Sequence, residues 1–185
     1  MYFLLLTATL GIGALSCQDA KPKGPAGAEQ TTAEIPEMDL QAAVIYGNLE
    51  AVKQHIKAGS DLNAKDPMSG STPLISAATF NKTEIANTLI DAGADLTIKN
   101  NDGATPLHVA VFFCRVEIVQ KLLDAGADKT VRNNFGATPR ETVMGSFTDV
   151  KPIYEFMQAQ LGPLGLELDL EDLEKTRPVI AMMLQ

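Results

Sequence analysis

The chain has 185 residues, of which 45% are hydrophobic, so it is long enough to form one domain with a substantial core. Its formal net charge is −8 and its Lys and Arg residues form no cluster, which argues against a nucleic-acid partner because such binding depends on neutralising phosphates. The two cysteines, Cys17 and Cys114, allow at most one disulfide and form no Cys-x-x-Cys motif.

Residues 1–16 have the pattern of an export signal. Phe3 to Leu15 is apolar or small throughout, which is too short to span a bilayer but suits the core of a signal peptide. The segment Ala14-Leu15-Ser16-Cys17 resembles the lipobox of bacterial lipoproteins, in which the cysteine is lipidated and becomes the new N-terminus. This resemblance implies export to the periplasm or cell envelope, with Cys17 as the lipid attachment site and the only link to a membrane.

Ordinary cleavage is the alternative for the same segment. Ala14 stands where the lipobox usually has Leu, and no Lys or Arg precedes the apolar core. Ordinary signal peptidase prefers small residues at the positions of Ala14 and Ser16, and it would cut the same bond. The sequence therefore leaves lipidation and simple cleavage both open.

Residues 17–35 are expected to form a flexible tether. The segment is rich in Pro, Gly, Ala, Thr and Lys and has almost nothing to bury. A linker of about 18 residues has a root-mean-square reach of roughly 20–25 Å, which would hold a domain just clear of a membrane surface.

The central part of the chain is repetitive. The motif Thr105-Pro106-Leu107-His108-Val109-Ala110 is preceded by Thr72-Pro73-Leu74 and followed by Thr138-Pro139, at steps of 105 − 72 = 33 and 138 − 105 = 33 residues. A period of 33 with Thr-Pro-Leu-His-x-Ala is the signature of the ankyrin repeat. The chain therefore resembles the ankyrin-repeat family. This implies an all-α solenoid of about four helix-turn-helix repeats, joined by short hairpin-like turns, over residues 36–161.

One repeat can be explained residue by residue. Thr105 is a good N-cap, and Pro106 at the first helical position loses no hydrogen bond. Leu107 is expected to be buried between the inner and outer helices. The outer helix, residues 117–123, has apolar pairs that recur four residues apart, and Gly126 supplies the left-handed residue that ends it.

The two end repeats are expected to be caps. The first begins near Pro36 and lacks Thr-Pro, which suits an N-terminal repeat whose outer side faces water. Repeat four keeps Thr138-Pro139 but has Arg140 in place of the usual Leu, and its second helix, about residues 151–160, is out of step. A degenerate last copy is typical of a C-terminal cap.

Residues 162–185 form a tail that is not a fifth repeat. Leu164, Leu166, Leu168 and Leu170 alternate with Gly or acidic residues, which predicts an extended segment. One or two helical turns are expected over 171–176, and Pro178 is expected to interrupt them. The apolar end that follows should dock, and the outer face of repeat four is the expected place.

The titratable residues form no catalytic constellation, so the sequence predicts a non-enzymatic protein with no cofactor and no metal. The ankyrin resemblance implies that His108 hydrogen-bonds neighbouring turns. His55, on an outer helix, is expected to be solvated. Cys114 stands where the family usually has Gly and is expected to be inert core or groove wall, and it makes a poor metal pair with His108.

Ankyrin proteins usually bind partner proteins through their turn tips and the concave wall of their inner helices. Carried onto this chain, the resemblance implies the following partner-binding residues: Ile45, Tyr46, Met68, Thr79, Phe80, Phe112, Phe113 and Phe135. Tyr46, Phe80 and Phe113 occupy equivalent positions at steps of 34 and 33, and are expected to be partly exposed. Aromatic and Met side chains are common anchors of interfaces.

Two other roles for these rings stay open. They could pad the groove against the next turn, or be covered by the chain's own tail, with residues 164–170 lying across them. The function predicted from the sequence is a monomeric protein-protein interaction module that binds another protein on its concave face. The alternative is a structural stabiliser of an envelope protein or enzyme without a discrete groove.

Overall fold

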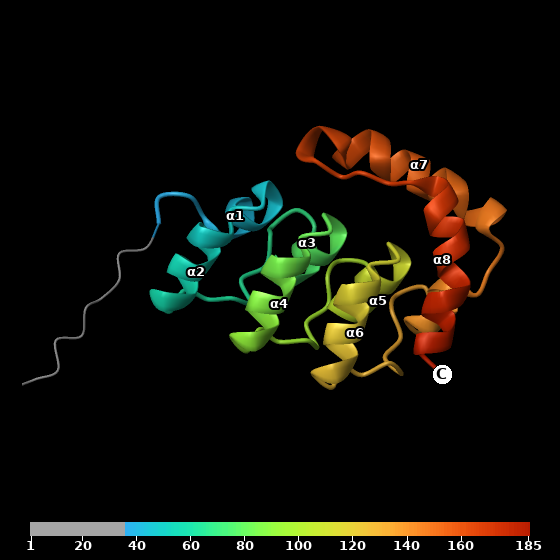
Figure 1. Cartoon of the computed structure of the whole chain (residues 1–185), viewed down its shortest axis with the longest axis horizontal. Coiled ribbons are helices and arrows are strands. Elements are labelled where there is room, and N and C mark those ends of the chain that lie inside the picture. Colours follow the sequence, from blue (N-terminus) through green and yellow to red (C-terminus); the bar gives the residue numbers. More distant parts are fainter. Residues whose placement is uncertain (1–35) are drawn as a thin grey trace, which may run out of the picture. The chain divides into compact units, whose positions relative to one another are not determined.

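The computed structural model describes residues 36–185, and this range contains helices and no strand. The first three repeats each form an inner and an outer helix, which stack side by side (Figure 1). The inner helices are α1 (Leu40–Tyr46), α3 (Pro73–Thr79) and α5 (Pro106–Phe112). The outer helices are α2 (Leu49–Lys57), α4 (Thr83–Asp91) and α6 (Val116–Asp124). The structure thus confirms an all-helical ankyrin-type stack.

The inner helices begin as the repeated motif predicts. The hydroxyls of Thr72 and Thr105 accept hydrogen bonds from the amides of Ile75 and His108, and a proline occupies the first position of each helix. Leu107 lies in the core with no exposed surface, as predicted. These caps and buried leucines fix the inner helices against the outer row.

The junction between each inner and outer helix requires a left-handed backbone. Gly47 has φ of 76° at this place in repeat one, whereas Asn81 and Cys114 have φ of 53° in repeats two and three. Asparagine tolerates this conformation better than most residues, but cysteine has no such preference. Cys114 is therefore held there by its surroundings rather than by its own backbone preference.

The fourth repeat is built differently from the prediction. Its inner helix is a short 3-10 turn, η1 (Arg140–Val143), which packs on α5. A long helix, α7 (Phe147–Leu161), follows and leads through η2 (Gly162–Leu164) to a second long helix, α8 (Leu170–Met183). Helix α8, not the segment 151–160, contacts both η1 and α6.

Helix α8 takes the place of an outer helix and runs parallel to α6 (Figure 1). Near its start, the Cys114 thiol donates to the carbonyl of Leu173, at an S···O distance of 3.9 Å. Near its end, Arg140 Nε donates to the carbonyl of Ala181 at 3.0 Å, and Lys129 Nζ donates to the carbonyl of Gln185. Repeat four therefore carries residues 147–169 as an insertion between its inner and outer helices.

Two expectations for residues 162–185 are wrong. Helix α8 runs on to Met183, well beyond the one or two turns expected over 171–176, and Pro178 lies inside the helix rather than ending it. Proline disfavours helical backbone at the residue before it, here Arg177. That residue is buried and hydrogen-bonded, and Leu173, Ile180 and Leu184 bury the same helix face, so packing outweighs the local preference.

Within residues 36–185, every helix is too short or too polar to cross a membrane. The expected signal and tether, residues 1–16 and 17–35, lie outside the described residues.

Candidate partner-binding surface

The residues predicted to bind a partner fall into two groups in the structure. Phe80 and Phe113 are buried, with 8% and 3% of their surface exposed, so the expectation that they are partly exposed is wrong. Tyr46, Met68 and Phe135 are open to solvent, with exposed fractions of 69%, 88% and 79%. Ile45, Thr79 and Phe112 are half-buried.

Phe112 and Phe113 belong to an aromatic cluster that helix α7 completes. Tyr154 of α7 is fully buried, and its ring stacks on Phe112 with centroids 4.6 Å apart. Phe112 meets Phe113 edge to face at 5.1 Å, and Phe147 stacks on Tyr154 at 6.0 Å. The chain itself therefore covers Phe112 and Phe113 through Tyr154 of α7, and residues 165–169 line a cavity beside Phe113.

Polar contacts fasten this cluster. The Tyr154 hydroxyl donates to the carbonyl of Phe112 at 2.6 Å and accepts from Arg177 Nη1 at 3.1 Å. Arg177, 3% exposed, also donates through Nη2 to the carbonyls of Gly145 at 3.1 Å and Thr142 at 3.5 Å. One guanidinium thus ties α8 to α7 and to the chain after η1. Sequence patterns gave no sign of it, because its partners, one tyrosine hydroxyl and two backbone carbonyls, are distant in sequence.

The electrostatics of this region keep its reactive groups neutral. Burial raises the pKa of the Tyr154 hydroxyl to about 12, with Arg177 acting in the opposite direction. Burial likewise raises the pKa of the Cys114 thiol to about 11. A thiol is nucleophilic as its thiolate, so Cys114 is unreactive near neutral pH.

A cavity of about 630 Å³ lies beside the cluster, where the loops after α3 and α5 face residues 165–173. It is lined by Phe80, Phe113, Cys114 and Leu173, together with the charged groups Lys82, Arg115, Asp169 and Asp172. The Arg115 guanidinium lies over the Phe113 ring, 5.7 Å from its centroid, and donates to the carbonyl of Thr79 at 3.2 Å. The segment before α8 therefore faces Phe80 and Phe113 without filling the space between.

The two histidines are both structural. His108 completes a capping box with Thr105 and donates from Nε2 to the carbonyl of Ala137 in the next turn at 3.1 Å, as the resemblance implied. Burial lowers the pKa of His108. The expectation for His55 is wrong. Its ring is buried, accepts from Ser60 Oγ at 2.9 Å and donates to the carbonyl of Met38 at 2.8 Å.

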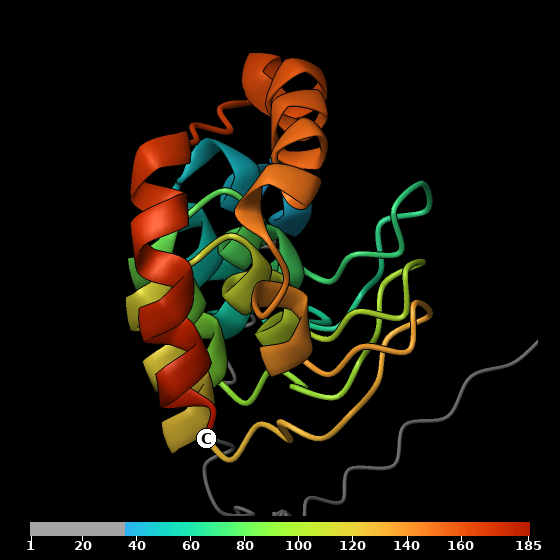
Figure 2. The ribbon, with the colours of Figure 1, turned by 90° about the vertical axis from the view of Figure 1, so that its right-hand side faces the viewer.

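The exposed residues Met68 and Phe135 stand on turns that are tied to one another. Asn101 Nδ2 donates to the carbonyl of Met68 at 2.8 Å, and Asn134 Nδ2 donates to the carbonyl of Asn101 at 2.9 Å. The backbone amide of Asn101 also bonds to Ser69, and that of Asn134 to Asp102. Figure 2 shows the turns projecting as a row from one side of the stack.

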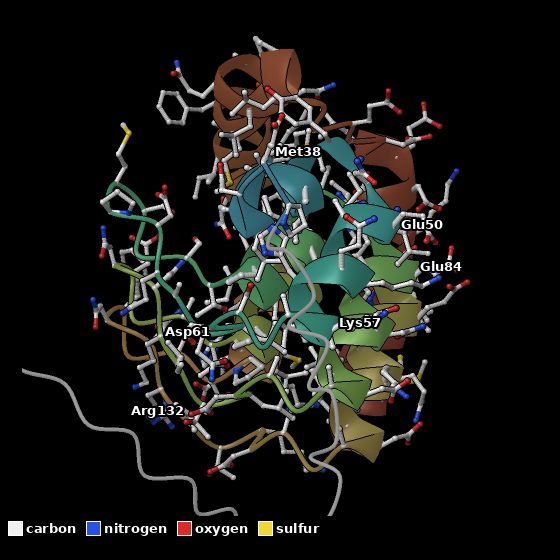
Figure 3. All side chains as sticks on the ribbon, turned by 90° about the vertical axis from the view of Figure 1, so that its left-hand side faces the viewer. Met38, Glu50, Lys57, Asp61, Glu84 and Arg132 are labelled. Carbon is white, nitrogen blue, oxygen red and sulfur yellow. The ribbon has the colours of Figure 1, made fainter. Side chains whose placement is uncertain are left out.

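The spacing of this row depends on glycine. Gly70 has φ of 68°, and a Cβ atom there would lie 3.0 Å from the backbone nitrogen of Asn101. A Cβ atom on Gly103 would likewise lie 2.8 Å from the backbone nitrogen of Asn134. Because only glycine permits both this backbone conformation and this approach, the turns form a fixed row. Figure 3 places Asp61 and Arg132 on this turn side, with Glu50, Glu84 and Lys57 on the opposite side.

Among residues 36–185, no three His, Cys, Asp or Glu side chains are grouped so that they could hold a metal ion.

Residues 40–133, which are 94 of the 185 residues, match the family described as ankyrin repeats in three copies. The chain belongs to the ankyrin-repeat family. Members of this family are generally non-enzymatic interaction scaffolds, so the repeats of this chain indicate a protein-protein interaction module.

Known proteins resemble this ankyrin chain over its repeats. It is 42% identical over 78 residues to an ankyrin repeat protein of Rickettsia bellii, covering 39% of this chain and 46% of that one. Human protein phosphatase 1 regulatory subunit 27 is 44% identical over 64 residues, covering 35% of this chain and 41% of its own length. The chain thus spans less than half the length of these relatives.

A solved structure shows the same fold. The ankyrin repeat domain of Bcl-3, a member of the IkappaB protein family, superposes with a TM-score of 0.54 at 30% identity. The superposition covers 56% of this chain and 45% of the solved Bcl-3 ankyrin-domain chain.

Proposed function

We propose that this protein is an exported, non-enzymatic module that holds a partner protein on its concave face, with the turn tips and the exposed end of α1 as the contact surface. The observation that carries the proposal is the exposure of Met68 and Phe135 on turns that hydrogen bonds lock into one row. Tyr46 and the half-buried Ile45 and Thr79 extend the surface onto the inner helices.

The physical argument rests on pre-organisation. The free energy falls when a partner covers large apolar side chains that were exposed to water. Met and aromatic residues are enriched in interfaces for this reason. Part of that gain is lost when a loop must be ordered on binding. The row of turns is already fixed, so Met68 and Phe135 would bind with little of this loss.

Phe80, Phe112 and Phe113 are not part of the proposed surface. Phe80 and Phe113 are buried, and Phe112 lies under Tyr154. A protein partner, rather than a small molecule, fits a surface whose anchors stand on separate turns. The name of one relative, a regulatory subunit of protein phosphatase 1, supports the same class of partner without indicating its identity.

Site-specific photo-cross-linking tests the proposal. A photoreactive amino acid at Met68 or Phe135 should capture one protein in cells that make this chain. The same group at Glu84, which is exposed on the opposite side, should not capture it.

The captured protein then allows affinity measurements. Phe135→Ala should raise the dissociation constant about 30-fold, the loss expected for a hot-spot side chain, with the melting temperature unchanged. Glu84→Ala is the control. Equal affinity for wild type and for Met68→Ala, Phe135→Ala and Tyr46→Ala would instead favour the alternative, a stabiliser of an envelope protein without a discrete groove.

Export and lipidation are a separate part of the proposal, carried by the sequence of residues 1–17. Radiolabelled palmitate should enter the wild-type protein and not Cys17→Ala. A protein that is cleaved before Cys17 and exported, yet unlabelled, would show ordinary signal cleavage and remove the membrane anchor.

A further inference from the structure

The last repeat exposes a groove where a following repeat would stack. A cavity of about 360 Å³ lies between η1, the start of α7 and α8, on the end of the molecule that faces the viewer in Figure 2. We call this cavity the end groove. Its apolar lining consists of Val143, Met144, Phe147, Pro178, Ala181 and Met182. In repeats one to three, the next inner and outer helices pack against the corresponding side.

The surface of this end carries exposed apolar side chains. Met144 and Met182 expose 54% and 61% of their surface, and Val179 on α8 exposes 46%. The terminal repeats of a solenoid need a polar outer face to remain soluble. Exposed apolar side chains grouped at this position are of the kind that a partner covers.

The end groove also carries two opposite charges. Arg140 and Glu174 both line it. Neither belongs to an ion pair within residues 36–185. Arg140 uses Nε to bond the carbonyl of Ala181, which fixes its side chain at the groove. Arg177, which also lines the groove, is already bonded to Tyr154, Gly145 and Thr142.

These features favour a second copy of this chain as the occupant. A two-fold axis pairs one surface with itself, so the surface must carry both members of each contact. One cation and one anion, unpaired inside the chain and set in an apolar groove, meet that condition. We propose that two copies associate end to end, with Arg140 of each protomer paired with Glu174 of the partner subunit and with Met144 and Met182 packed between them.

This pairing is independent of the concave binding surface. The end groove is formed by η1, α7 and α8, whereas Met68 and Phe135 stand on the turns. The dimer would therefore leave both concave faces accessible, and the two proposals can succeed or fail separately.

Sedimentation of the full-length chain over a range of concentrations tests the pairing. The wild type should show a reversible monomer–dimer equilibrium. Met182→Glu should raise the dimer dissociation constant about 30-fold or more, because it places a charge in the apolar contact. The matched control is Met68→Glu, which changes a still more exposed methionine on a turn tip and should leave the dimer intact.

A charge exchange makes the test specific. Arg140→Glu and Glu174→Arg should each be monomeric where the wild type is dimeric, because each places like charges across the axis. Mixed in equal amounts, the two variants should form a heterodimer, since the mixed pair restores both opposite-charge contacts. Circular dichroism checks that each variant folds. If Arg140→Glu does not fold, the proposal is tested by the effect of Met182→Glu on the dimer dissociation constant.

Three results would overturn the proposal. The first is a wild type that stays monomeric up to about 100 μM, because the dissociation constant would then be higher than that of most specific complexes. The second is an association that Met182→Glu leaves unchanged, which would place the contact elsewhere, including residues 1–35. The third is an open series of larger species, which would indicate head-to-tail stacking instead of a closed pair.

Discussion

At the scale of single residues, the two histidines show how burial assigns a role. His108 was expected to be structural because it belongs to a repeated motif, and it is. His55 was expected to face solvent because it lies on an outer helix, yet it is buried. One side of each outer helix is buried, so the exposure of a single position depends on which neighbouring segment packs against it. Here the segment before α1 supplies a carbonyl for His55.

Leu107→Ala should lower the free energy of unfolding by about 2–4 kcal/mol, because the side chain is fully buried and its removal leaves a cavity. Chemical denaturation measures this change. Leu123→Ala on the neighbouring helix is the matched control, since Leu123 is only partly buried and should cost less. A loss below about 1 kcal/mol for Leu107→Ala would contradict its place in the core.

The lowered pKa of His108 predicts a pH dependence of stability. Because the folded pKa lies below the ordinary value of 6.5, the unfolded state binds more protons between the two values. The stabilisation from neutral His108 is therefore complete above about pH 6.5 and is lost as the pH falls through the folded pKa.

Melting temperatures of the wild type and His108→Asn between about pH 7 and pH 5 test this dependence. The wild type should lose more stability over this range than the variant. Asp66 and Glu141 also have lowered pKa values, but they titrate below their ordinary values of 3.8 and 4.5 and do not interfere. Equal slopes for the two proteins would show that His108 does not titrate with folding.

At the scale of elements, helix α7 is held by one aromatic cluster and one hydrogen-bond relay. Phe147, Val150, Met157 and Leu161 are partly buried against the core, whereas Ile153 and Phe156 are exposed at 48% and 65%. Tyr154 is the only residue of α7 that is buried. Tyr154 is therefore the most deeply buried contact that docks this helix.

Tyr154→Phe should lower the free energy of unfolding by about 1–3 kcal/mol, because it keeps the ring but leaves the Phe112 carbonyl and a buried Arg177 N–H without their partner. Hydrogen exchange should rise most in residues 147–161. Tyr46→Phe removes a hydroxyl from an exposed ring and should change neither quantity. Unchanged exchange in α7 would show that the relay does not hold the helix.

At the scale of the whole molecule, α8 completes the fourth repeat although it lies beyond a long insertion. It buries Leu173, Ile180 and Leu184 against η1 and α6. The last repeat is thus formed by segments that are separated by residues 147–169. Truncation of the final helix should therefore destabilise the neighbouring repeat and not only the C-terminus.

Deletion of residues 170–185 should lower stability by on the order of 5 kcal/mol, since three buried aliphatic side chains contribute roughly 1.5–3 kcal/mol each. Hydrogen exchange should rise in α6, η1 and α7, and much less in α1 to α4, because each repeat contacts only its neighbours. Exchange in α6 that is unchanged by the deletion would show that residues 170–185 are not part of the repeat stack.

The sequence by itself determined the repeats, because each depends on local signals: the Thr-Pro cap, the helical spacing of apolar residues, and the period of 33. It also indicated which turn-tip residues, Met68 and Phe135, carry large apolar side chains. Only the tertiary structure decided the exposure of Phe80 and Phe113 and the position of the last outer helix. Pro178 disfavours helical backbone at Arg177, and long-range burial of Leu173, Arg177 and Ile180 outweighs that preference. Such burial depends on surfaces that the distant repeats create, so no local pattern reports it.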